Sequence, residues 1–448
     1  MVRQRAGRRL RPPGFRLLPG WSWRHMSGTM LVERWRDVVA QRGRDWAVHD
    51  LTTDRRWSFS ELAAAAEQLP DPGPMVFPQG TSVGFIQSVL QGWHWKRVVC
   101  PLEPGQARPE LALPPIGTAH LKLTSGTTGE PKGVRFTAEQ LAADPAAIQA
   151  TMGLTPASPN LGVISLAHSY GFSNLVLPLL LGGIPLILVP SPLPAVLQRA
   201  AAAQGESRLT LPAVPALWRT WYEARAIPAN VQLAISAGAP LSLPLEQSVH
   251  LEFGLKLHNF LGASECGGIA YDGTELPRTD PSVVGTALQG VQLARNADGC
   301  LEVRGPSVAA GYWPERTGPL EGGVFRTTDL VEFGVNGVVQ LRGRLSDVIQ
   351  VAGRKVSPES IEAVLREHPA VADCLVLGVP SDEARGEAVA VVVEVQGEYR
   401  EAELKSFLQT RLPDWQWPRL WRQVETLGVN GRGKRSRAEW RQFFSNPV

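Results

Sequence analysis

The chain has 448 residues, enough for two or more domains with a sizeable buried core. A hydrophobic content of 44% and a charged content of 19% are those of an ordinary soluble globular protein. The net charge is +3, but residues 1–29 hold seven arginines and no acid, so the remainder is mildly acidic and gives no reason to expect nucleic-acid binding.

Residues 1–29 are the first unusual segment. An Arg-rich, acid-free head is a feature of organelle-targeting segments, but this one lacks their serine enrichment and amphipathic period. It also lacks the apolar run of a secretory signal. We predict a basic, disordered head, or a translation start further along, at Met26 or Met30.

Short β-like runs alternate with helix-like segments through most of the chain, which predicts an α/β fold. Residues 61–69 read as a helix, with Ser58 and Ser60 as candidate caps. The apolar run 175–190 is too short for a membrane span and is broken by proline and glycine, so it predicts a buried helix, a Gly-Gly turn and a buried strand. The runs 208–214, 231–236, 255–260 and 300–305 read as strands.

A compact α+β unit is predicted from residue 345 to the end of the chain. Its expected elements are strands at 346–353, 372–380 and 388–395 and helices at 357–369 and 401–412. The predicted organisation is therefore a basic head (1–29), a large multi-subdomain α/β domain (30–344) and a small C-terminal domain (345–448). The four cysteines are far apart without CxxC spacing, which argues against zinc or disulfides and suits a reducing, cytoplasmic location.

The run LTSGTTGEPKGV (123–134) carries the most chemistry. Its lysine lies between proline and glycine, so it is not a Walker loop. Glycines nevertheless let backbone N–H groups approach a phosphate, hydroxyls add donors, and a lysine adds compact positive charge. The expected phosphate-binding residues are Thr124, Ser125, Gly126, Thr127, Thr128, Gly129 and Lys132.

This run resembles the phosphate loop of the adenylate-forming superfamily, which includes acyl-CoA synthetases, firefly luciferase and peptide-synthetase adenylation domains. Further stretches resemble that family's motifs in order, so the resemblance covers roughly residues 31–445. They are SLAHSYGF (165–172), ISAGAPL (235–241), NFLGASECGG (259–268), FRTTDL (325–330), GRLSDVIQ (343–350), VAGRKVSPESIE (351–362), VPSDEARGEAVAVVV (379–393) and NGRGKRSR (430–437).

The resemblance assigns roles to residues outside the phosphate loop. Ala237, Gly238 and Gly262 would line the adenine and acyl pockets, Ser264 would contact the α-phosphate, and Glu265 would bind Mg²⁺. Asp329 and Arg344 would bind the ribose, and His168 would lie beside the substrate carboxylate. Lys434 would be the catalytic lysine, bridging that carboxylate and the α-phosphate.

Three positions depart from the family pattern. Leu261 replaces the usual adenine-stacking aromatic residue, Thr328 replaces a glycine, and Ser346 replaces the hinge aspartate. The segment between residue 62 and the phosphate loop is also short, as in compact members such as o-succinylbenzoate–CoA ligases.

The resemblance implies an ATP-dependent carboxylate–CoA ligase that uses ATP, Mg²⁺ and coenzyme A. The candidates for the acyl pocket are mostly small or apolar, with no acid placed to hold an α-amino group, which favours a fatty or aromatic acid over an amino acid. They are His168, Tyr170, Phe172, Ala237, Gly238, Gly262, Gly267, Gly268 and Ile269. Two alternatives stay open: transfer of the acyl group to an acyl carrier protein or another acceptor, and a nucleotide-binding homologue without catalysis. No nucleic-acid partner is expected.

Overall fold

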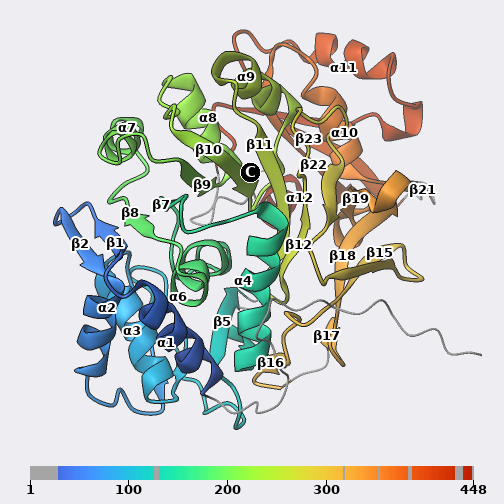
Figure 1. Cartoon of the computed structure of the whole chain (residues 1–448). Helices are drawn as coiled ribbons and strands as arrows, with labels where there is room; N and C mark the ends of the chain where they lie inside the picture. Colours follow the sequence, from blue (N-terminus) through green and yellow to red (C-terminus); the bar gives the residue numbers. More distant parts are fainter. Residues whose placement is uncertain are drawn as a thin grey trace, which may run out of the picture.

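The computed structural model describes residues 29–125, 131–315, 318–351, 354–381, 386–428 and 437–445. Its largest sheet has 14 strands among these residues, in the order β14-β15-β18-β19-β13-β12-β11-β10-β9-β7-β8-β1-β2, with β17 paired to β18 (Figure 1). In chain order the strands are β1 (Trp46–Asp50), β2 (Arg55–Ser58), β7 (Asn160–Gly162), β8 (Leu186–Leu188), β9 (Leu209–Ala213), β10 (Val231–Ala237), β11 (Leu257–Ala263), β12 (Gly267–Tyr271), β13 (Val283–Ala287), β14 (Gln292–Arg295), β15 (Cys300–Arg304), β17 (Leu320–Glu321), β18 (Val324–Phe333) and β19 (Val339–Arg344).

The middle of this sheet is parallel: β11, β10, β9, β7, β8 and β1 run in one direction, and the strands from β12 to β19 pair antiparallel. Parallel strands are covered on both faces, which explains why their sequences are apolar runs. One face packs under α7 (Pro194–Ala202), α8 (Pro215–Glu223) and α9 (Leu243–Phe253). The opposite face packs on α4 (Ala138–Met152), the π-helix η1 (Phe172–Val176) and α6 (Leu177–Gly182).

A smaller sheet and three helices complete the N-terminal part. The sheet has the order β16-β6-β5-β4-β3, formed by β3 (Met75–Val76), β4 (Val98–Val99), β5 (His120–Ser125), β6 (Pro131–Phe136) and β16 (Gly311–Trp313). The helices are α1 (Met30–Arg42), α2 (Phe59–Glu67) and α3 (Val83–His94), and the short α5 (Ser169–Gly171) precedes η1. The helix predicted at 61–69 corresponds to α2, and one of its predicted caps is confirmed. Ser58 forms a capping box with Glu61 at the start of α2.

The apolar segment 175–190 folds as predicted, into the end of η1, α6, a left-handed turn at Gly183 (φ 66°) and the buried strand β8. Left-handed backbone at the end of a helix favours glycine because it has no Cβ. Among the described residues, no helix is long and apolar enough to cross a membrane.

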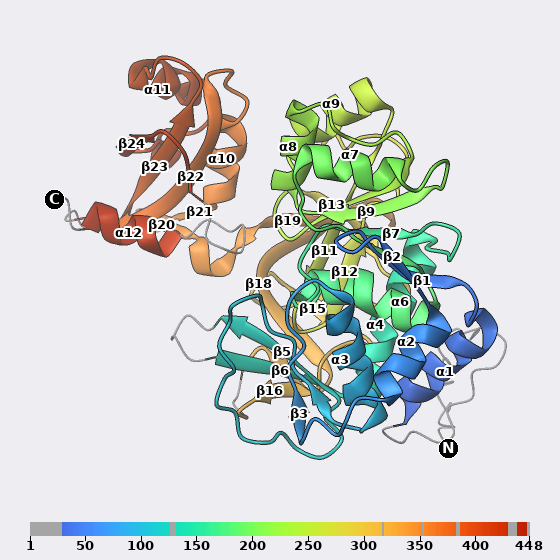
Figure 2. The same ribbon diagram turned by 90° about the vertical axis from the view of Figure 1, so that its left-hand side faces the viewer.

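The C-terminal unit is a three-stranded sheet, order β22-β23-β24, between two apolar clusters. It contains β20 (Ile349–Val351), β21 (Arg354–Val356), α10 (Pro358–Leu365), β22 (Val371–Pro380), β23 (Glu387–Val395), α11 (Glu401–Gln409), the 3-10 turn η4 (Asp414–Gln416), β24 (Leu420–Val424) and α12 (Arg437–Ser445). Figure 2 shows this unit, orange to red, beside the larger part and connected to it after β19. The predicted class, a large α/β part followed by a small α+β unit, is confirmed.

Two predicted C-terminal elements are shorter than expected. The strand predicted to start at residue 346 begins only at Ile349, the first residue of β20. Leu345–Asp347 form the 3-10 turn η3 instead, where the carboxylate of Asp347 pairs with Arg437 of α12 (2.7 Å). The helix predicted at 357–369 ends at Leu365, and the Arg366 side chain that follows bonds Asp373 and the Cys374 carbonyl of β22.

Candidate functional site

The predicted adenine and acyl-pocket residues come from neighbouring parallel strands. β10 ends at Ala237 and β11 at Ala263, and Ala237 lies opposite Phe260 in the parallel register. Ligands in such sheets bind beyond the carboxyl ends of the strands. Gly238 follows β10 with φ 87°, and Gly262 faces Gly268 across the β11–β12 pairing, where an added Cβ would lie 2.9 Å from the Gly267 carbonyl oxygen. The backbone therefore needs glycine at both positions.

The predicted phosphate loop connects β5 and β6, which pair antiparallel with Thr124 opposite Lys132. The hairpin places the first and last residues of the motif side by side. Gly126, Thr127, Thr128 and Gly129 lie outside the described residues, as do the side chains of Ser125 and Lys132. Their phosphate-binding role stays a prediction from the motif.

Glu265 is half-buried in the turn between β11 and β12, next to the half-buried Ser264. Its Oε1 accepts a hydrogen bond from the Tyr312 hydroxyl at 3.2 Å, and its carbonyl oxygen accepts one from the Ala309 N–H at 2.9 Å. Tyr312 lies on β16, opposite Val134 of β6. The sheet that carries the phosphate loop therefore also contacts the predicted metal ligand.

The chemistry of Glu265 fits Mg²⁺. Among the residues described, no three His, Cys, Asp or Glu side chains gather into a metal cluster. Mg²⁺ is typically bound by one or two carboxylates, with nucleotide phosphates and water as its other ligands. Glu265 would hold the ion in that way, and the ion would supply positive charge against the phosphates.

Asp329 and Arg344, the two predicted ribose ligands, form a direct cross-strand pair. They are opposite each other on β18 and β19, and Arg344 Nε donates to Asp329 Oδ1 at 2.9 Å. The Asp329 N–H also donates to the Thr327 hydroxyl at 3.0 Å, which orients this middle part of β18. The Asp329 side chain is 23% exposed, so it remains accessible to a ligand hydroxyl.

Replacing Asp329 with Asn is expected to weaken ATP binding by about tenfold or more. A hydrogen bond to a charged group is worth about 1.5–3 kcal/mol, and Asn lacks the charge while keeping the size. The check is calorimetric titration with ATP and with 3′-deoxy-ATP, where the variant should lose most of the preference for ATP. Glu332→Gln is the matched control, because Glu332 forms a similar pair with Arg342 on the same two strands (2.9 Å). An unchanged preference in Asp329→Asn would remove Asp329 from the ribose site.

His168 is exposed at the start of α5, where its Nδ1 accepts a hydrogen bond from the Tyr170 N–H at 3.3 Å. Behind it, the Tyr170 hydroxyl donates to the Ile235 carbonyl oxygen of β10 at 3.3 Å, and its ring lies 6.1 Å from that of Phe260. Burial raises the pKa of Tyr170 well above its usual value, so its hydroxyl stays protonated and uncharged. These aromatic rings lie between the His168 turn and the ends of β10 and β11.

Phe172 was also expected to line the acyl pocket, and this expectation is wrong. Its side chain is fully buried and its ring lies 4.5 Å from that of His120 and 6.5 Å from that of Phe85. The π-helix that begins at Phe172 turns the ring into the core. Tyr170 and His168, two and four residues earlier, remain as pocket candidates.

Lys434 is outside the described residues, so its catalytic role stays a prediction.

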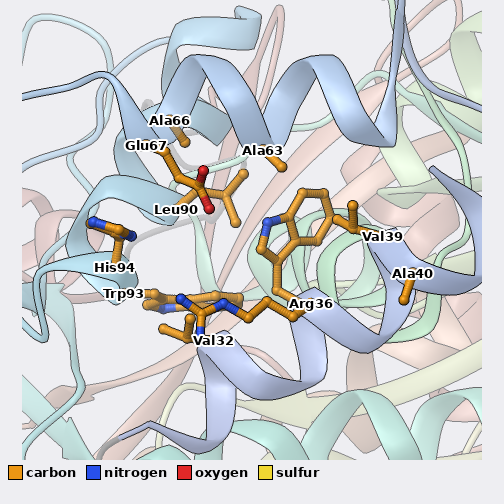
Figure 3. Close-up of a pocket in the computed structure, with 11 residues that line it drawn as sticks. Val32, Arg36, Val39, Ala40, Ala63, Ala66, Glu67, Leu90, Trp93 and His94 are labelled. Atoms are coloured by element: carbon orange, nitrogen blue, oxygen red, sulfur yellow. The ribbon is translucent and has the colours of Figure 1, made fainter. Parts of the chain in front are cut away.

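A cavity of about 230 Å³ lies between α1, α2 and α3, where Figure 3 shows Arg36 beside Trp93, with Glu67 and His94 also lining it. None of the predicted site residues lines this cavity, so it is separate from the candidate site.

Comparison with known proteins identifies the family of the chain. Residues 87–313 match the model of the AMP-binding enzyme family, and residues 360–434 match that of the AMP-binding enzyme C-terminal domain. The chain belongs to the AMP-binding enzyme family. A probable 2-succinylbenzoate–CoA ligase of Mycobacterium tuberculosis is 33% identical over 294 residues, which cover 61% of this chain and 70% of the relative.

Solved structures extend the likeness in fold to most of the chain. ATP-bound MatB from Rhodopseudomonas palustris superimposes with a TM-score of 0.82 at 21% identity, covering 94% of this chain and 99% of MatB. The amide bond synthetase McbA from Marinactinospora thermotolerans superimposes with a TM-score of 0.78 at 22% identity, covering 93% and 100%. The predicted enzyme class is confirmed: this AMP-binding enzyme is an AMP-forming ligase, and adenylate-forming CoA ligases use ATP, Mg²⁺ and coenzyme A.

Sequence reasoning missed Tyr312 as a contact of Glu265. The two residues are 47 positions apart, and only the pairing of β16 with β6 brings the hydroxyl to the carboxylate. No local pattern around residue 312 indicates such a contact.

Proposed function

We propose that this AMP-binding enzyme joins a fatty or aromatic carboxylic acid to coenzyme A through an acyl-adenylate. The observation that carries the proposal is the arrangement of Glu265, Ser264 and the Asp329–Arg344 pair on a chain of this family. Aromatic acids are the first class to test. Tyr170 and Phe260 form an aromatic wall beside the expected carboxylate position, and the 33% identical relative is named for 2-succinylbenzoate.

In the first half-reaction the substrate carboxylate attacks the α-phosphorus of ATP and pyrophosphate leaves. Negative charge gathers on the phosphate oxygens in the transition state, so positive groups and aligned donors lower the barrier. Lys132 and Lys434 would supply the charge, and Thr124, Ser125, Thr127, Thr128 and Ser264 the hydroxyl donors. Asp329 and Arg344 would hold the ribose, while His168 would lie beside the attacking carboxylate.

In the second half-reaction the thiol of coenzyme A attacks the acyl carbonyl carbon and AMP leaves. We propose that the C-terminal domain (345–448) rotates between the two steps and takes Lys434 away from the site. Hinge motions of this kind let one site run two reactions. The Arg437–Asp347 ion pair (2.7 Å) fixes Asp347 of η3 to α12, so in this proposal Asp347 moves with the C-terminal domain.

The first experiment is ATP–pyrophosphate exchange over a panel of fatty and aromatic carboxylic acids, without coenzyme A. Exchange with one acid class would establish adenylation and identify the substrate class. Adding coenzyme A, or an acyl carrier protein in its place, would then identify the acceptor. ATP binding without exchange for any acid would contradict the proposal and favour a nucleotide-binding homologue without catalysis.

A further inference from the structure

A buried charged network lies directly beneath the turn that carries Glu265. Lys122 of β5 is 5% exposed and Asp144 of α4 is 3% exposed. Charged side chains are almost never buried to this degree unless they are paired, because transfer from water to the interior is costly. The candidate site itself uses neither residue, so their burial has to be explained by what they contact.

The network is a chain of contacts that ends on the β11–β12 turn. Lys122 Nζ contacts the hydroxyl of the buried Ser173 at 3.4 Å, and that hydroxyl donates to Asp144 Oδ2. Asp144 Oδ1 accepts a hydrogen bond from the Gly268 N–H at 3.0 Å. A bond from a backbone N–H to a charged carboxylate is shorter and stronger than one to a neutral oxygen.

Asp144 also touches the turn at the preceding residue. Gly267 has φ 71°, and a Cβ there would lie only 2.1 Å from Asp144 Oδ1. The carboxylate is therefore packed against the backbone of two successive residues, and Glu265 precedes them in the same turn. From the other side the Tyr312 hydroxyl bonds the Glu265 carboxylate at 3.2 Å.

Lys122 balances the charge that this arrangement requires. Burial lowers the pKa of the Lys122 ammonium, and the nearby Asp144 carboxylate, followed by Cys266 and Glu265, acts against that shift. Without Lys122, a buried carboxylate would face the Glu265 turn with no nearby opposite charge among these contacts, and the two carboxylates would repel each other. Lys122 also lies two residues before Thr124 on β5, so the pair connects the base of the phosphate loop to the metal-ligand turn.

We propose that Lys122 and Asp144 are a positioning pair, which holds the Glu265 turn in register with β5, the strand that leads into the phosphate-loop motif. Both side chains are buried, so the pair would act through the Glu265 turn and not by contact with the nucleotide. The inference rests on the proposed role of Glu265 in the function given above. The inference requires the two charges to act together. Removing one of them should therefore raise the Mg²⁺ requirement for ATP binding more than removing both.

The test measures how much Mg²⁺ is needed to half-saturate ATP binding, by calorimetric titration of the full chain with ATP at a series of Mg²⁺ concentrations and no acid substrate. The variants are Lys122→Met, Asp144→Asn and the double Lys122→Met/Asp144→Asn. Each single variant is expected to raise the half-saturating Mg²⁺ by about tenfold or more, the range for residues that orient a metal ligand. The double variant should return to within about threefold of the unchanged protein, because Asn still accepts from the Gly268 N–H.

Asp272→Asn is the matched control, since Asp272 is a buried aspartate (2% exposed) bonded to Lys256 at 2.8 Å and is not part of the candidate site. It should lower the unfolding temperature and leave the Mg²⁺ requirement unchanged. The proposal is overturned if Lys122→Met and Asp144→Asn bind with the original Mg²⁺ requirement, if the double variant is as impaired as the singles, or if Asp272→Asn raises the requirement equally. If Lys122→Met does not fold, Asp144→Asn and the double variant decide.

Failure of this inference is separable from failure of the proposed function. One outcome is that no acid supports pyrophosphate exchange, while the Mg²⁺ requirement rises in each single variant and is restored in the double variant. This outcome would contradict the ligase activity and retain the positioning role. Normal pyrophosphate exchange, together with a Mg²⁺ requirement that is the same in all three variants, would retain the ligase activity and contradict the positioning role.

Discussion

Replacing Lys434 with Ala should reduce ATP–pyrophosphate exchange by at least about 100-fold, the loss typical for one group aimed at transition-state charge. Lys434 is expected to bridge the substrate carboxylate and the α-phosphate, and both carry negative charge while the acyl-adenylate forms. The second half-reaction does not need this bridge. Thioester formation from supplied acyl-adenylate and coenzyme A should therefore stay within about threefold of the unchanged enzyme.

A lysine of the same unit provides the control. Lys405 lies on α11 and pairs with Glu401 one turn earlier, at 2.6 Å, with its side chain 44% exposed. Lys405→Ala removes a positive charge from the C-terminal unit and should change neither half-reaction. Equal loss of both half-reactions in Lys434→Ala would show that the lysine matters for the fold or for binding in general, and its assigned role would be wrong.

Replacing Lys256 with Met should destabilise the large domain by about 3–5 kcal/mol, the usual cost of removing one member of a buried ion pair. The Lys256 ammonium bonds the Glu246 carboxylate and Asp272 Oδ2 (2.8 Å), and Arg278 Nε bonds Glu246 at 2.8 Å. The side chains of all four residues are at most 6% exposed. Two positive and two negative charges balance, and they fasten α9 to the strands β11 and β12 that carry the candidate site.

The measurement is thermal unfolding, where the variant should melt about 5 °C or more below the unchanged protein. Lys405→Met is the surface control, and its effect should stay below about 1 kcal/mol because exposed pairs contribute little. A Lys256→Met variant as stable as Lys405→Met would show that the buried network does not stabilise the domain.

The stability lost in Lys256→Met should depend on pH, because Lys256 bonds the titratable carboxyl of Asp272. Burial alone would raise the pKa of Asp272, but hydrogen bonds from Lys256 and Thr274 outweigh it and the pKa is lowered. A carboxyl with a depressed pKa stabilises the fold above its unfolded pKa and loses that contribution as the pH falls through the folded value. The stability gap between Lys256→Met and the unchanged protein should therefore narrow at pH values below about 4, the ordinary pKa of an aspartate.

Most of the candidate site could be predicted from local sequence because its motifs are local. The phosphate loop, the Glu265 turn and the Asp329 strand each carry their chemistry within about ten residues. Element predictions succeeded where the local signal is clear, such as the Ser58 cap of α2 and the apolar runs of β22 and β23. The strand predicted to start at residue 346 was too long, because the residues before β20 form η3, where Asp347 bonds the distant Arg437.

The sequence by itself determined the family, the order of the motifs and the types of most elements, because those follow from residue spacing over short stretches. Only the tertiary structure decided which distant residues surround Glu265. Tyr312, Lys122 and Asp144 lie far from it in sequence, and their patterns are those of ordinary strand and helix residues. Their contacts exist because the β5–β6–β16 sheet and α4 pack against the β11–β12 turn, and long-range packing of this kind leaves no periodic trace in the chain.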